Sequence, residues 1–553
     1  AAPAAVPSGY SIAVAASQPL VKRPLFAALD DAGALYVLES GGANGNDRRE
    51  KPSDLIRRLT DENGDGVYDR AEVFAEGIVF GAGLAWHDGA LFVTSPPSLW
   101  KFEDRDRDGT AERRTELVTA FAFNQSCTDD AHGAVLGPDG RIYFLPGRFP
   151  HRIQAPNGSV VREGYGPWLM RCRPDGSEIE VVGGAVGNPV EVAFSAAGDA
   201  FVQGTFWAKP SVGDGLRDAV IHAIPGGEYS VRDRDYTDRI RTGDFLPALV
   251  PLTATAPSGL AVVRGAELGD ESQGALFTSH FNTGKILRHR LRDNGATFST
   301  QAEDFVVANN RDVHFTDVLE DADGSLLVVD TGGWYLACCP ASGSARPNIL
   351  GGIYRVSRDG AKRPADPSGR ELAWDDASID SLIERLDDDR WRVRDRAIAA
   401  LAKRGGAAIE ALQKTLKDDA SSTRAKLAAT WTLCRIDAPA AREIARIALD
   451  DSSAEVRQAA ASSAALHRDA GALEKLVERL ADPAPRVRRE AAHALGRIGD
   501  SNAVAPLLQA VSDAANALPT KGDDGAAGRR FAEHALIFSL IEIDAPEVTR
   551  AGL

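Results

Sequence analysis

The sequence predicts a six-bladed β-propeller followed by an α-solenoid. Three observations predict this fold class: a hairpin pattern that recurs, the spacing of its copies, and a change from strand-like to helical periodicity near residue 376. In residues 132–144 an apolar run meets Pro138-Asp139-Gly140 and a second run follows. Proline presets φ for such a turn, and glycine accepts a positive φ. Equivalent positions in the six copies are Leu29, Ala85, Leu136, Phe194, Val262 and Leu319, so the spacings are 56, 51, 58, 68 and 57 residues. Such spacings lie just above the common propeller repeats.

The domain boundaries follow from composition. We expect the propeller over residues 1–356, a polar, proline-rich linker over 357–375, and helices over 376–553. In the helical part a Val-Arg or Thr-Arg pattern recurs with its arginines 30, 33 and 31 residues apart, at Arg394, Arg424, Arg457 and Arg488. Helix pairs at this period resemble HEAT repeats.

Charge and apolar runs exclude several classes. The chain has 553 residues and a net charge of −16, which argues against nucleic acid as a partner. No apolar run reaches the ~18 residues of a membrane helix. The first residues, AAPAAVPSGY, look like a mature end left after removal of a signal peptide, so we expect a periplasmic or secreted protein.

Two acidic loops predict structural calcium. The first matches the EF-hand loop pattern but is flanked by strands, so we expect it on a propeller blade. Its expected ligands are Asp61, Asn63, Asp65, the Val67 carbonyl, Asp69 and Glu72. The second loop lacks the glutamate of position 12, which is Thr115 here, and predicts weaker binding. Its candidates are Asp104, Asp106, Asp108, Thr110 and Glu112.

Polar residues precede several of the innermost strands, so we expect them to gather around the propeller axis. His132 and His314 lie at such positions and are the catalytic candidates, together with Asp317 near a strand end. Asn188, Glu191, His280 and Asn282 are candidates for binding substrate, although His280 follows the second strand of its hairpin and is expected to reach the axis less directly. Imidazoles with carboxylates suit either a general base with an orienting acid or a transition-metal site at His132, His280 and His314. The alternative is that each histidine hydrogen-bonds its neighbouring blade.

The hairpin that begins at His132 resembles the catalytic-histidine hairpin of the soluble quinoprotein glucose and aldose sugar dehydrogenases, which are six-bladed propellers. Gly187-Asn188-Pro189 resembles another of their elements. The whole layout is similar to the planctomycete and verrucomicrobial "membrane-bound dehydrogenase" propellers with HEAT repeats. The features that carry this resemblance are the acidic loops, the segment 332–340, the Leu-Gly-Gly-Ile-Tyr-Arg-Val ending and the helical repeats. Those proteins often end in a haem-binding domain, but this chain has no Cys-x-x-Cys-His and so no haem attachment site.

The resemblance implies sugar oxidation, yet the quinone itself is disfavoured. Pyrroloquinoline quinone carries three carboxylates, and the cations that hold it in the sugar dehydrogenases correspond here to Gly187, Asn282, His314 and Thr316. Burying a trianion without cations is costly. Arg148, Lys209 and Lys285 are the residues that could compensate.

Adjacent cysteines and aromatic residues suggest a platform for a sugar ring. Cys338 and Cys339 are either reduced thiols or a vicinal disulfide, which export favours. Trp334 and Tyr335 lie beside them, and Trp168 and Trp207 could add stacking faces.

We therefore expect an exported, carbohydrate-directed enzyme with its pocket on the propeller axis, by resemblance a sugar dehydrogenase-like oxidoreductase. One alternative is a metal- or histidine-dependent polysaccharide lyase or hydrolase. The other is a non-catalytic glycan-binding propeller. In each case the helical repeats could recruit a cytochrome or another protein. The fold alone does not decide among these functions.

Overall fold

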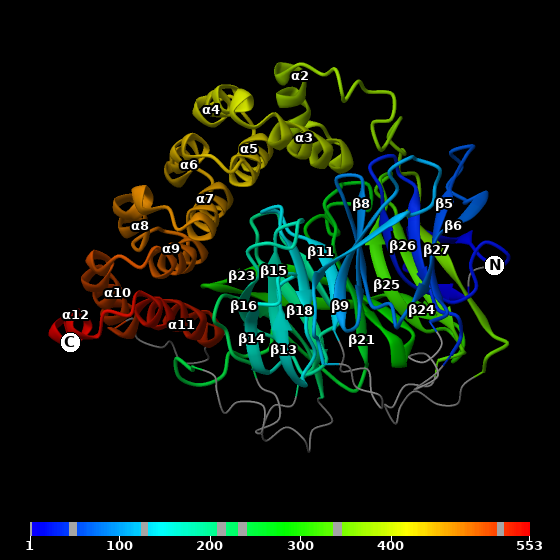
Figure 1. Cartoon of the computed structure of the whole chain (residues 1–553), viewed down its shortest axis with the longest axis horizontal. Helices are drawn as coiled ribbons and strands as arrows, with labels where there is room; N and C mark the ends of the chain where they lie inside the picture. Colours follow the sequence, from blue (N-terminus) through cyan, green and yellow to red (C-terminus); the bar gives the residue numbers. More distant parts are fainter. Residues whose placement is uncertain are drawn as a thin grey trace.

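The propeller consists of six antiparallel sheets around one axis, as a computed structural model shows (Figure 1). The structure describes residues 3–43, 52–122, 131–206, 217–229, 240–335, 346–516 and 525–552. The innermost strands of the blades are β3 (Pro24–Leu29), β7 (Leu84–His87), β11 (His132–Leu136), β17 (Glu191–Phe194), β21 (Pro257–Val262) and β25 (Phe315–Glu320). Each of them contacts the innermost strands of both neighbouring blades, which closes the ring.

The remaining strands follow outward in each blade. The second strands are β4 (Leu35–Glu39), β8 (Ala90–Ser95), β12 (Ile142–Leu145), β18 (Ala200–Thr205), β22 (Leu276–His280) and β26 (Leu326–Gly332). The third strands are β5 (Asp54–Thr60), β9 (Ser98–Glu103), β15 (Trp168–Cys172), β19 (Asp218–Ala223), β23 (Lys285–Asn294) and β27 (Leu350–Arg358). The outer strands are β6 (Arg70–Ile78), β10 (Arg113–Val118), β16 (Glu180–Gly184), β20 (Val250–Leu252), β24 (Thr297–Ala308) and β2 (Tyr10–Ala16).

The N-terminal segment closes the propeller. Strand β2 pairs with β27 and so completes the last blade with residues from the start of the chain. Strand β1 (Ala4–Ala5) adds to the outer edge of the preceding blade through β24. A separate hairpin, β13 (Pro150–Gln154) and β14 (Val160–Tyr165), is inserted in the third blade. This closure confirms the six-bladed propeller that the hairpin spacing predicts.

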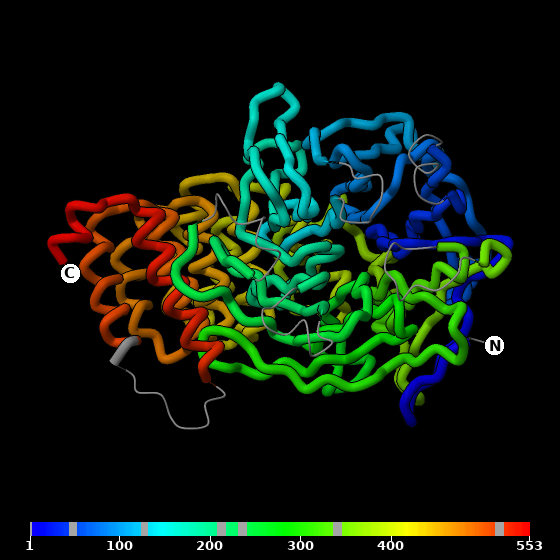
Figure 2. Tube along the Cα trace, turned by 90° about the horizontal axis from the view of Figure 1, so that it is seen from below, coloured from blue at the N-terminus to red at the C-terminus, as the bar shows by residue number. Residues whose placement is uncertain are grey.

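The helical part forms an arc over one face of the propeller (Figure 1). Its helices are α2 (Ile379–Glu384), α3 (Trp391–Arg404), α4 (Ile409–Lys417), α5 (Thr423–Arg435), α6 (Pro439–Ala445), α7 (Ala454–His467), α8 (Leu473–Arg479), α9 (Pro485–Ile498), α10 (Val504–Asn516), α11 (Ala526–Ile543) and α12 (Pro546–Gly552). Seen from below, the helices lie beside the green blades, with the C-terminus far from the N-terminus (Figure 2). In the described residues no helix has the length and apolar character needed to cross a membrane.

The helices dock on the hairpin turns that the sequence pattern identifies. The Trp431 indole donates to the Ala196 carbonyl at 2.9 Å, and the Arg435 guanidinium donates to the Pro138 carbonyl at 2.9 Å. A Cβ at Gly140, whose φ is +78°, would meet the Arg435 side chain at 2.9 Å. Glycine therefore serves both the turn and the close approach of α5.

The segment between the two parts is held against the propeller. Strand β27 ends at Arg358 and α2 begins at Ile379. Between them, Arg363 donates to the Asp65 carbonyl at 2.9 Å, and Arg370 donates to the Ala32 carbonyl. The polar composition of this segment thus reflects contacts with the hairpin turns of the first blade.

Candidate functional site

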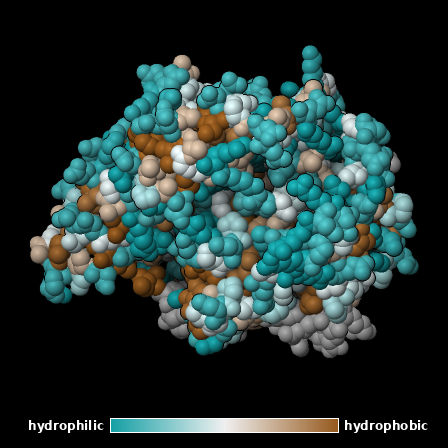
Figure 3. Space-filling view, turned by 45° about the horizontal axis from the view of Figure 1, so that its top comes forward, coloured by the Kyte–Doolittle hydropathy of each residue, from teal (hydrophilic) through white to brown (hydrophobic). Residues whose placement is uncertain are grey.

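A cleft of about 1160 Å³ lies between the propeller and the first helices. We call it the interdomain cleft. All six innermost strands, β3, β7, β11, β17, β21 and β25, contribute to its propeller wall, and α3 and α5 contribute the opposite wall. Figure 3 shows the surface hollowed near the centre of the view, between mainly hydrophilic rims. The cleft reaches the propeller axis, because two carboxyl groups on the axis, those of Glu191 and Asp317, line it.

Glu191 and Asp317, which we call the axial pair, have carboxyl groups within hydrogen-bonding distance of one another. Glu191 also accepts the Leu260 amide at 2.6 Å, and Asp317 accepts the Ala27 amide at 2.8 Å. Innermost strands are sheet edges, so their inward amides need such acceptors. Each carboxyl thus satisfies the backbone of a neighbouring blade and also faces its partner across the axis.

Burial sets the protonation of the axial pair. Asp317 is 2% exposed, and burial raises its pKa to about 7. The pKa of Glu191 is also raised, first by burial and then by the charge of Asp317. Two carboxylates this close share a proton, because the first charge opposes the second. Above about pH 7 the pair therefore holds one proton and one negative charge.

A third buried carboxyl, Glu320, lines the same cleft. Burial raises the pKa of Glu320 to about 7. Its two oxygens accept the amides of Arg264 and Gly265, each at 2.7 Å. Because its hydrogen-bond partners are backbone amides of one turn, Glu320 is a natural comparison for the axial pair.

The helical wall brings tryptophans and arginines to the cleft. Trp391 donates its indole N–H to the Asp321 carbonyl at 3.0 Å, and the Arg264 guanidinium lies 4.1 Å from its ring centroid. The Arg396 guanidinium lies 4.0 Å from the Trp374 ring. Such stacking fixes guanidinium planes in place. The Val-Arg repeat indicates a solenoid, but its spacing does not show that some of its arginines face a cleft.

The histidine candidates His132 and His314 lie at or just before the starts of innermost strands. The strand register places His132, opposite Leu145, at the same level along the channel as Glu191, opposite Gln203. His132 begins β11 and is buried. His314 precedes β25, and its Nδ1 lies 2.9 Å from the Gly332 carbonyl. Its ring lies 4.5 Å from that of Phe281, and burial lowers its pKa. The His314 amide donates to Asp330, whose pKa burial raises to about 6.

The structure does not gather three histidines for one metal ion. Among the described residues, one group of three or more His, Cys, Asp or Glu side chains has ligand atoms close enough for an ion, and it contains no histidine. His280 instead faces Thr278, with Nε2 3.1 Å from its hydroxyl, and burial lowers its pKa to about 3. Because Thr278 and His280 are two residues apart on β22, their side chains lie on the same face of the strand, and the His280 ring contacts its own blade.

The other predicted binding residues have mixed placements. Trp334 is fully buried and donates to the Thr331 hydroxyl at 2.8 Å, so in this structure it is a core residue without a face for a sugar. Tyr335 is partly buried, 5.8 Å from the Phe281 ring. Asn282 donates to the Ala254 carbonyl at 3.2 Å. Arg148 is buried beside Phe149, and Asn188 is partly buried. Trp207, Cys338 and Cys339 lie outside the described residues.

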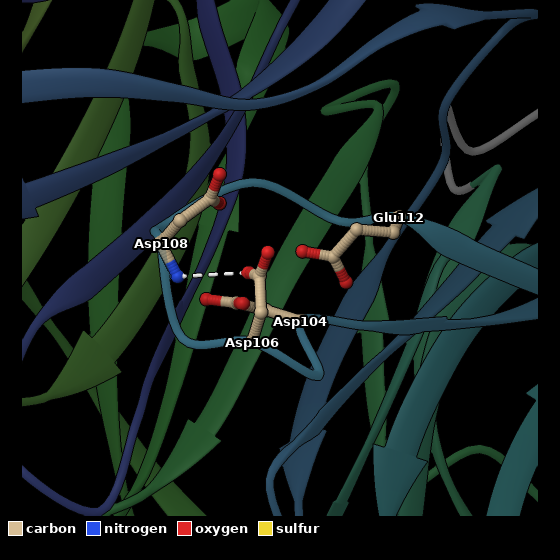
Figure 4. A group of neighbouring side chains, drawn as sticks. All are labelled: Asp104, Asp106, Asp108 and Glu112. Atoms are coloured by element: carbon tan, nitrogen blue, oxygen red, sulfur yellow. Dashed lines mark hydrogen bonds between the residues drawn. The ribbon is translucent and has the colours of Figure 1, made fainter.

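The group of side chains close enough to hold an ion belongs to the second acidic loop. Four carboxylates, from Asp104, Asp106, Asp108 and Glu112, face a common centre (Figure 4). The loop joins β9 to β10, so its strand flanks are as predicted. Asp104 Oδ1 is buried without a hydrogen-bond partner. The pKa of Asp106 is raised by its hydrogen bond with Glu112, as crowded carboxylates require. This donor set fits a hard cation such as Ca²⁺.

In the first acidic loop, which the sequence favours, the carboxylates do not come this close together, and Asn63, an amide, takes the place that Asp106 has in the second loop. It joins β5 to β6, again between strands. Asp61 accepts the Gly64 and Gly66 amides at 2.7 and 2.8 Å, as the loop pattern predicts. Glu72, however, pairs with Arg70 and lies beside Gly109 of the second loop. A guanidinium on the position-12 carboxylate opposes its use as a calcium ligand.

The fold thus defines a class: six-bladed propellers that carry a helical-repeat arc over the face where the innermost strands end. The chain belongs to the family described as a domain of unknown function (DUF7133), whose profile matches residues 3–336. HEAT repeats match residues 379–463 and 441–519, which confirms the predicted repeats. No curated protein matches the chain.

Solved structures with similar folds include sugar dehydrogenases. A protein provisionally assigned as an oxidoreductase (glucose dehydrogenase) from Thermus thermophilus is 16% identical, with a TM-score of 0.42, over 63% of this chain and 100% of that one. The quinone-binding (PQQ) domain of pyranose dehydrogenase from Coprinopsis cinerea is 14% identical, with a TM-score of 0.40, over 64% and 97%. The calcium-binding regucalcin of Agrobacterium tumefaciens is 12% identical, with a TM-score of 0.34, over 63% and 94%. At these values the likeness concerns the propeller alone. The resemblance to the planctomycete and verrucomicrobial proteins stays a prediction.

Proposed function

We propose that this protein is a carbohydrate-directed enzyme that works by acid–base catalysis in the interdomain cleft, with Glu191 and Asp317 as its reactive groups. The observation that carries the proposal is the axial pair itself: two mutually hydrogen-bonded carboxyls on the floor of the interdomain cleft. Titratable groups with perturbed pKa values in a large cleft are the usual mark of an active site. Tryptophans and arginines on the walls suit saccharides.

The state of the axial pair supports proton transfer. One carboxyl holds the shared proton and serves as a general acid, while the other is charged and serves as a general base. Since burial raises the pKa of Asp317 to about 7, both forms coexist near neutral pH. We expect activity to rise with pH through about 7, as Asp317 loses its proton, and to fall at higher pH, as Glu191 loses the remaining one, because either one extra or one missing proton disables the pair.

The spacing of the carboxyls separates reaction types. Glycosidases place their two carboxyls about 5–5.5 Å apart for retention or about 6.5–9.5 Å apart for inversion. A hydrogen bond places carboxyl oxygens about 3 Å apart. The hydrogen bond between the two carboxyls of the axial pair leaves no room for a water molecule between the bonded oxygens, and we therefore propose elimination within the alternatives of lyase and hydrolase.

Isosteric variants test the proposal. Glu191→Gln and Asp317→Asn keep an oxygen for the Leu260 and Ala27 amides but remove the ionisable group. We expect each to lower kcat at least 100-fold on a panel of neutral and acidic polysaccharides, followed by new reducing ends and by ultraviolet absorption of unsaturated products. Glu320→Gln, a change of the same kind in the same cleft, is expected to stay within threefold of the parent. Activity that survives in Glu191→Gln or Asp317→Asn would overturn the proposal.

A sugar oxidoreductase is the second candidate. What favours it is the position of His132 at the start of an innermost strand, where the resemblance places a catalytic histidine. The described residues there do not fit a quinone with three carboxylates. The cations Lys285 and Arg346 are already paired, with Asp304 at 2.6 Å and with Asp312 at 2.9 Å. The carboxyl of Asp330 accepts the His314 amide and so lies next to His314. Arg148 is a single buried cation, whereas a quinone with three carboxylates requires several cations.

Dye reduction separates the two candidates. Sugar-dependent reduction of a redox dye after addition of pyrroloquinoline quinone and calcium, lost in His132→Ala but retained in Asp317→Asn, would replace the acid–base proposal. We expect no such reduction. Ligand-dependent thermal shifts without turnover would instead indicate a glycan-binding propeller.

The second acidic loop supports a structural Ca²⁺ as part of the proposal. Asp104, Asp106, Asp108 and Glu112 would hold the ion, with the Thr110 carbonyl in the backbone position of the loop pattern. Because the loop joins two outer strands of a blade, the ion would stiffen the propeller, outside the interdomain cleft. We also propose that the enzyme is exported and that its helical repeats recruit a cytochrome or another protein.

A further inference from the structure

The basic residues of the interdomain cleft carry an inference about the substrate. The chain as a whole has a net charge of −16. Yet four arginines of the cleft, Arg394, Arg396, Arg404 and Arg435, are not paired with a carboxylate within 4 Å among the described residues. They donate to backbone carbonyls instead, those of Asp388, Ser368, Asp375 and Pro138. A carbonyl satisfies the N–H donors but does not neutralise the positive charge.

Arg394 and Arg396 also lie near other arginines of the cleft. The pKa of Arg394 is lowered, first by burial and then by Arg264 and Arg424, against the opposing effect of Asp395. Burial likewise lowers the pKa of Arg396; Asp31 opposes this shift and Arg392 adds to it. Like charges held together in a partly buried cleft raise the free energy of the protein, and a bound anion would relieve it.

The positions of the guanidinium groups are fixed before any ligand arrives. Arg396 is stacked on Trp374 and donates to the Ser368 carbonyl at 2.6 Å. Arg394 donates to the Asp388 carbonyl at 2.6 Å and to the Asp389 carbonyl at 2.9 Å. Pre-positioned planar forks suit carboxylate groups, since little side-chain freedom is lost on binding.

We propose that the interdomain cleft binds acidic saccharides through Arg394 and Arg396, each on a separate carboxylate because residues two apart on α3 do not face each other, and that one of these carboxylates belongs to a uronic acid that undergoes β-elimination. The second half of this inference rests on the proposed function. An arginine on the uronate carboxylate makes the proton on C5 more acidic. The charged carboxyl of the axial pair takes that proton, and the electron pair of the C5–H bond forms the C4=C5 double bond. The C4–O bond breaks, and the protonated carboxyl gives its proton to the leaving oxygen. The pair ends with one proton and one charge, as it began, and no oxidant or co-reactant is needed.

Binding is tested apart from catalysis in the Asp317→Asn protein, which keeps the cleft but lacks the shared proton. The probes are a tri-galacturonate and its fully methyl-esterified, uncharged counterpart, titrated calorimetrically. We expect the acid to bind at least tenfold more tightly than the ester. Arg394→Gln and Arg396→Gln, added singly, are each expected to weaken binding of the acid at least tenfold. Arg550→Gln removes the same charge from α12, outside the cleft, and is expected to leave binding unchanged.

Raising the ionic strength gives a second measurement that requires no arginine variant. We expect the affinity of Asp317→Asn for the acid to fall as salt increases, while that for the ester stays constant. Equal affinity for acid and ester, or equal effects of Arg396→Gln and Arg550→Gln, would overturn the inference.

The outcomes also separate the inference from the proposed function. If the acid binds as expected but the parent protein forms no unsaturated product, the cleft is an acidic-saccharide site and the acid–base function falls. If a neutral saccharide is converted in a manner that depends on the axial pair, the function stands and the inference about substrate charge falls.

Discussion

At the scale of single residues, the axial pair of Glu191 and Asp317 is the feature from which the account follows. Both carboxyls satisfy edge amides of neighbouring blades, which an amide side chain would do equally well. Unlike an amide, a carboxyl can also release and take up a proton. The raised pKa values show that this proton is retained near neutral pH at a cost in the stability of the folded state.

The cost predicts a pH-dependent gain in stability for Asp317→Asn. The pKa of Asp317 is about 7 in the folded protein and close to its ordinary value of 3.8 when unfolded. The folded protein therefore binds more protons between those values, and its stability falls as pH rises through them, by up to about 1.4 kcal/mol per pH unit. We expect the melting temperature of Asp317→Asn, relative to the parent, to rise from pH 4 to pH 7. A constant difference over this range would contradict the raised pKa.

At the scale of elements, the two acidic loops show what a linear pattern can and cannot predict. Both lie between strands, as their flanking residues predict. The pattern favours the loop at Asp61, however, because it has Glu72 at position 12. The competing contact of Arg70 with Glu72 depends on strand pairing and side-chain direction, so it is not visible in the spacing.

The loop at Asp104 is expected to bind Ca²⁺ and to stabilise the propeller. At a free calcium concentration 100 times the Kd, binding would add about 2.7 kcal/mol to the free energy of unfolding. Thermal unfolding with and without calcium measures this. The calcium effect is expected to disappear in Asp108→Asn and to persist in Asp359→Asn, a control at an exposed turn. A calcium effect that survives in Asp108→Asn but is lost in Asp61→Asn would reverse the assignment of the loops.

Helix α9 is anchored to the propeller by a buried ion pair. Arg489 lies 2.7 Å from Asp199, with side chains 4% and 0% exposed. Burial alone would raise the pKa of Asp199, but Arg489 and the hydrogen bond with His222 hold it well below its usual value. Removing Asp199 leaves the buried charge of Arg489 without this partner, which typically costs about 3–5 kcal/mol. In Arg489→Gln the charge of Asp199 keeps Arg486, 3.2 Å away.

A double-mutant cycle by denaturant unfolding measures this anchor. We expect Asp199→Asn and Arg489→Gln each to lose several kcal/mol of stability, and the double variant to lose less than the sum. Additive losses would show that the two side chains act independently.

At the scale of the whole molecule, the helical arc and the propeller form one structural unit. Helices α3, α5, α9 and α11 all reach propeller turns or strands; in α11, His534 lies 2.9 Å from the Pro225 carbonyl. We therefore expect a single cooperative transition in differential scanning calorimetry. In Arg489→Gln the helical part is expected to melt first, as a separate transition. Two transitions in the parent protein would show that the interface is weaker than its contacts imply.

The fold was predictable from the sequence to a greater degree than the site. Hairpin turns with proline and glycine, and arginines at a constant helical period, are local patterns, so they reveal blades and repeats. The interdomain cleft arises because α3 and α5 dock on those turns, and no local pattern records that docking. Asp317 and Glu191 were identifiable as candidates near strand ends, but not as partners of each other, because they lie 126 residues apart in the sequence. His132 drew attention by resemblance; its strand register is that of Glu191, but it does not line the cleft.

The most direct test of the account is a crystal structure of Asp317→Asn soaked with an acidic oligosaccharide. The account predicts a sugar in the interdomain cleft, with its carboxylate on Arg394 or Arg396 and the C5 position facing Glu191. A sugar bound beside His132 and His314, with the interdomain cleft holding only solvent, would contradict it.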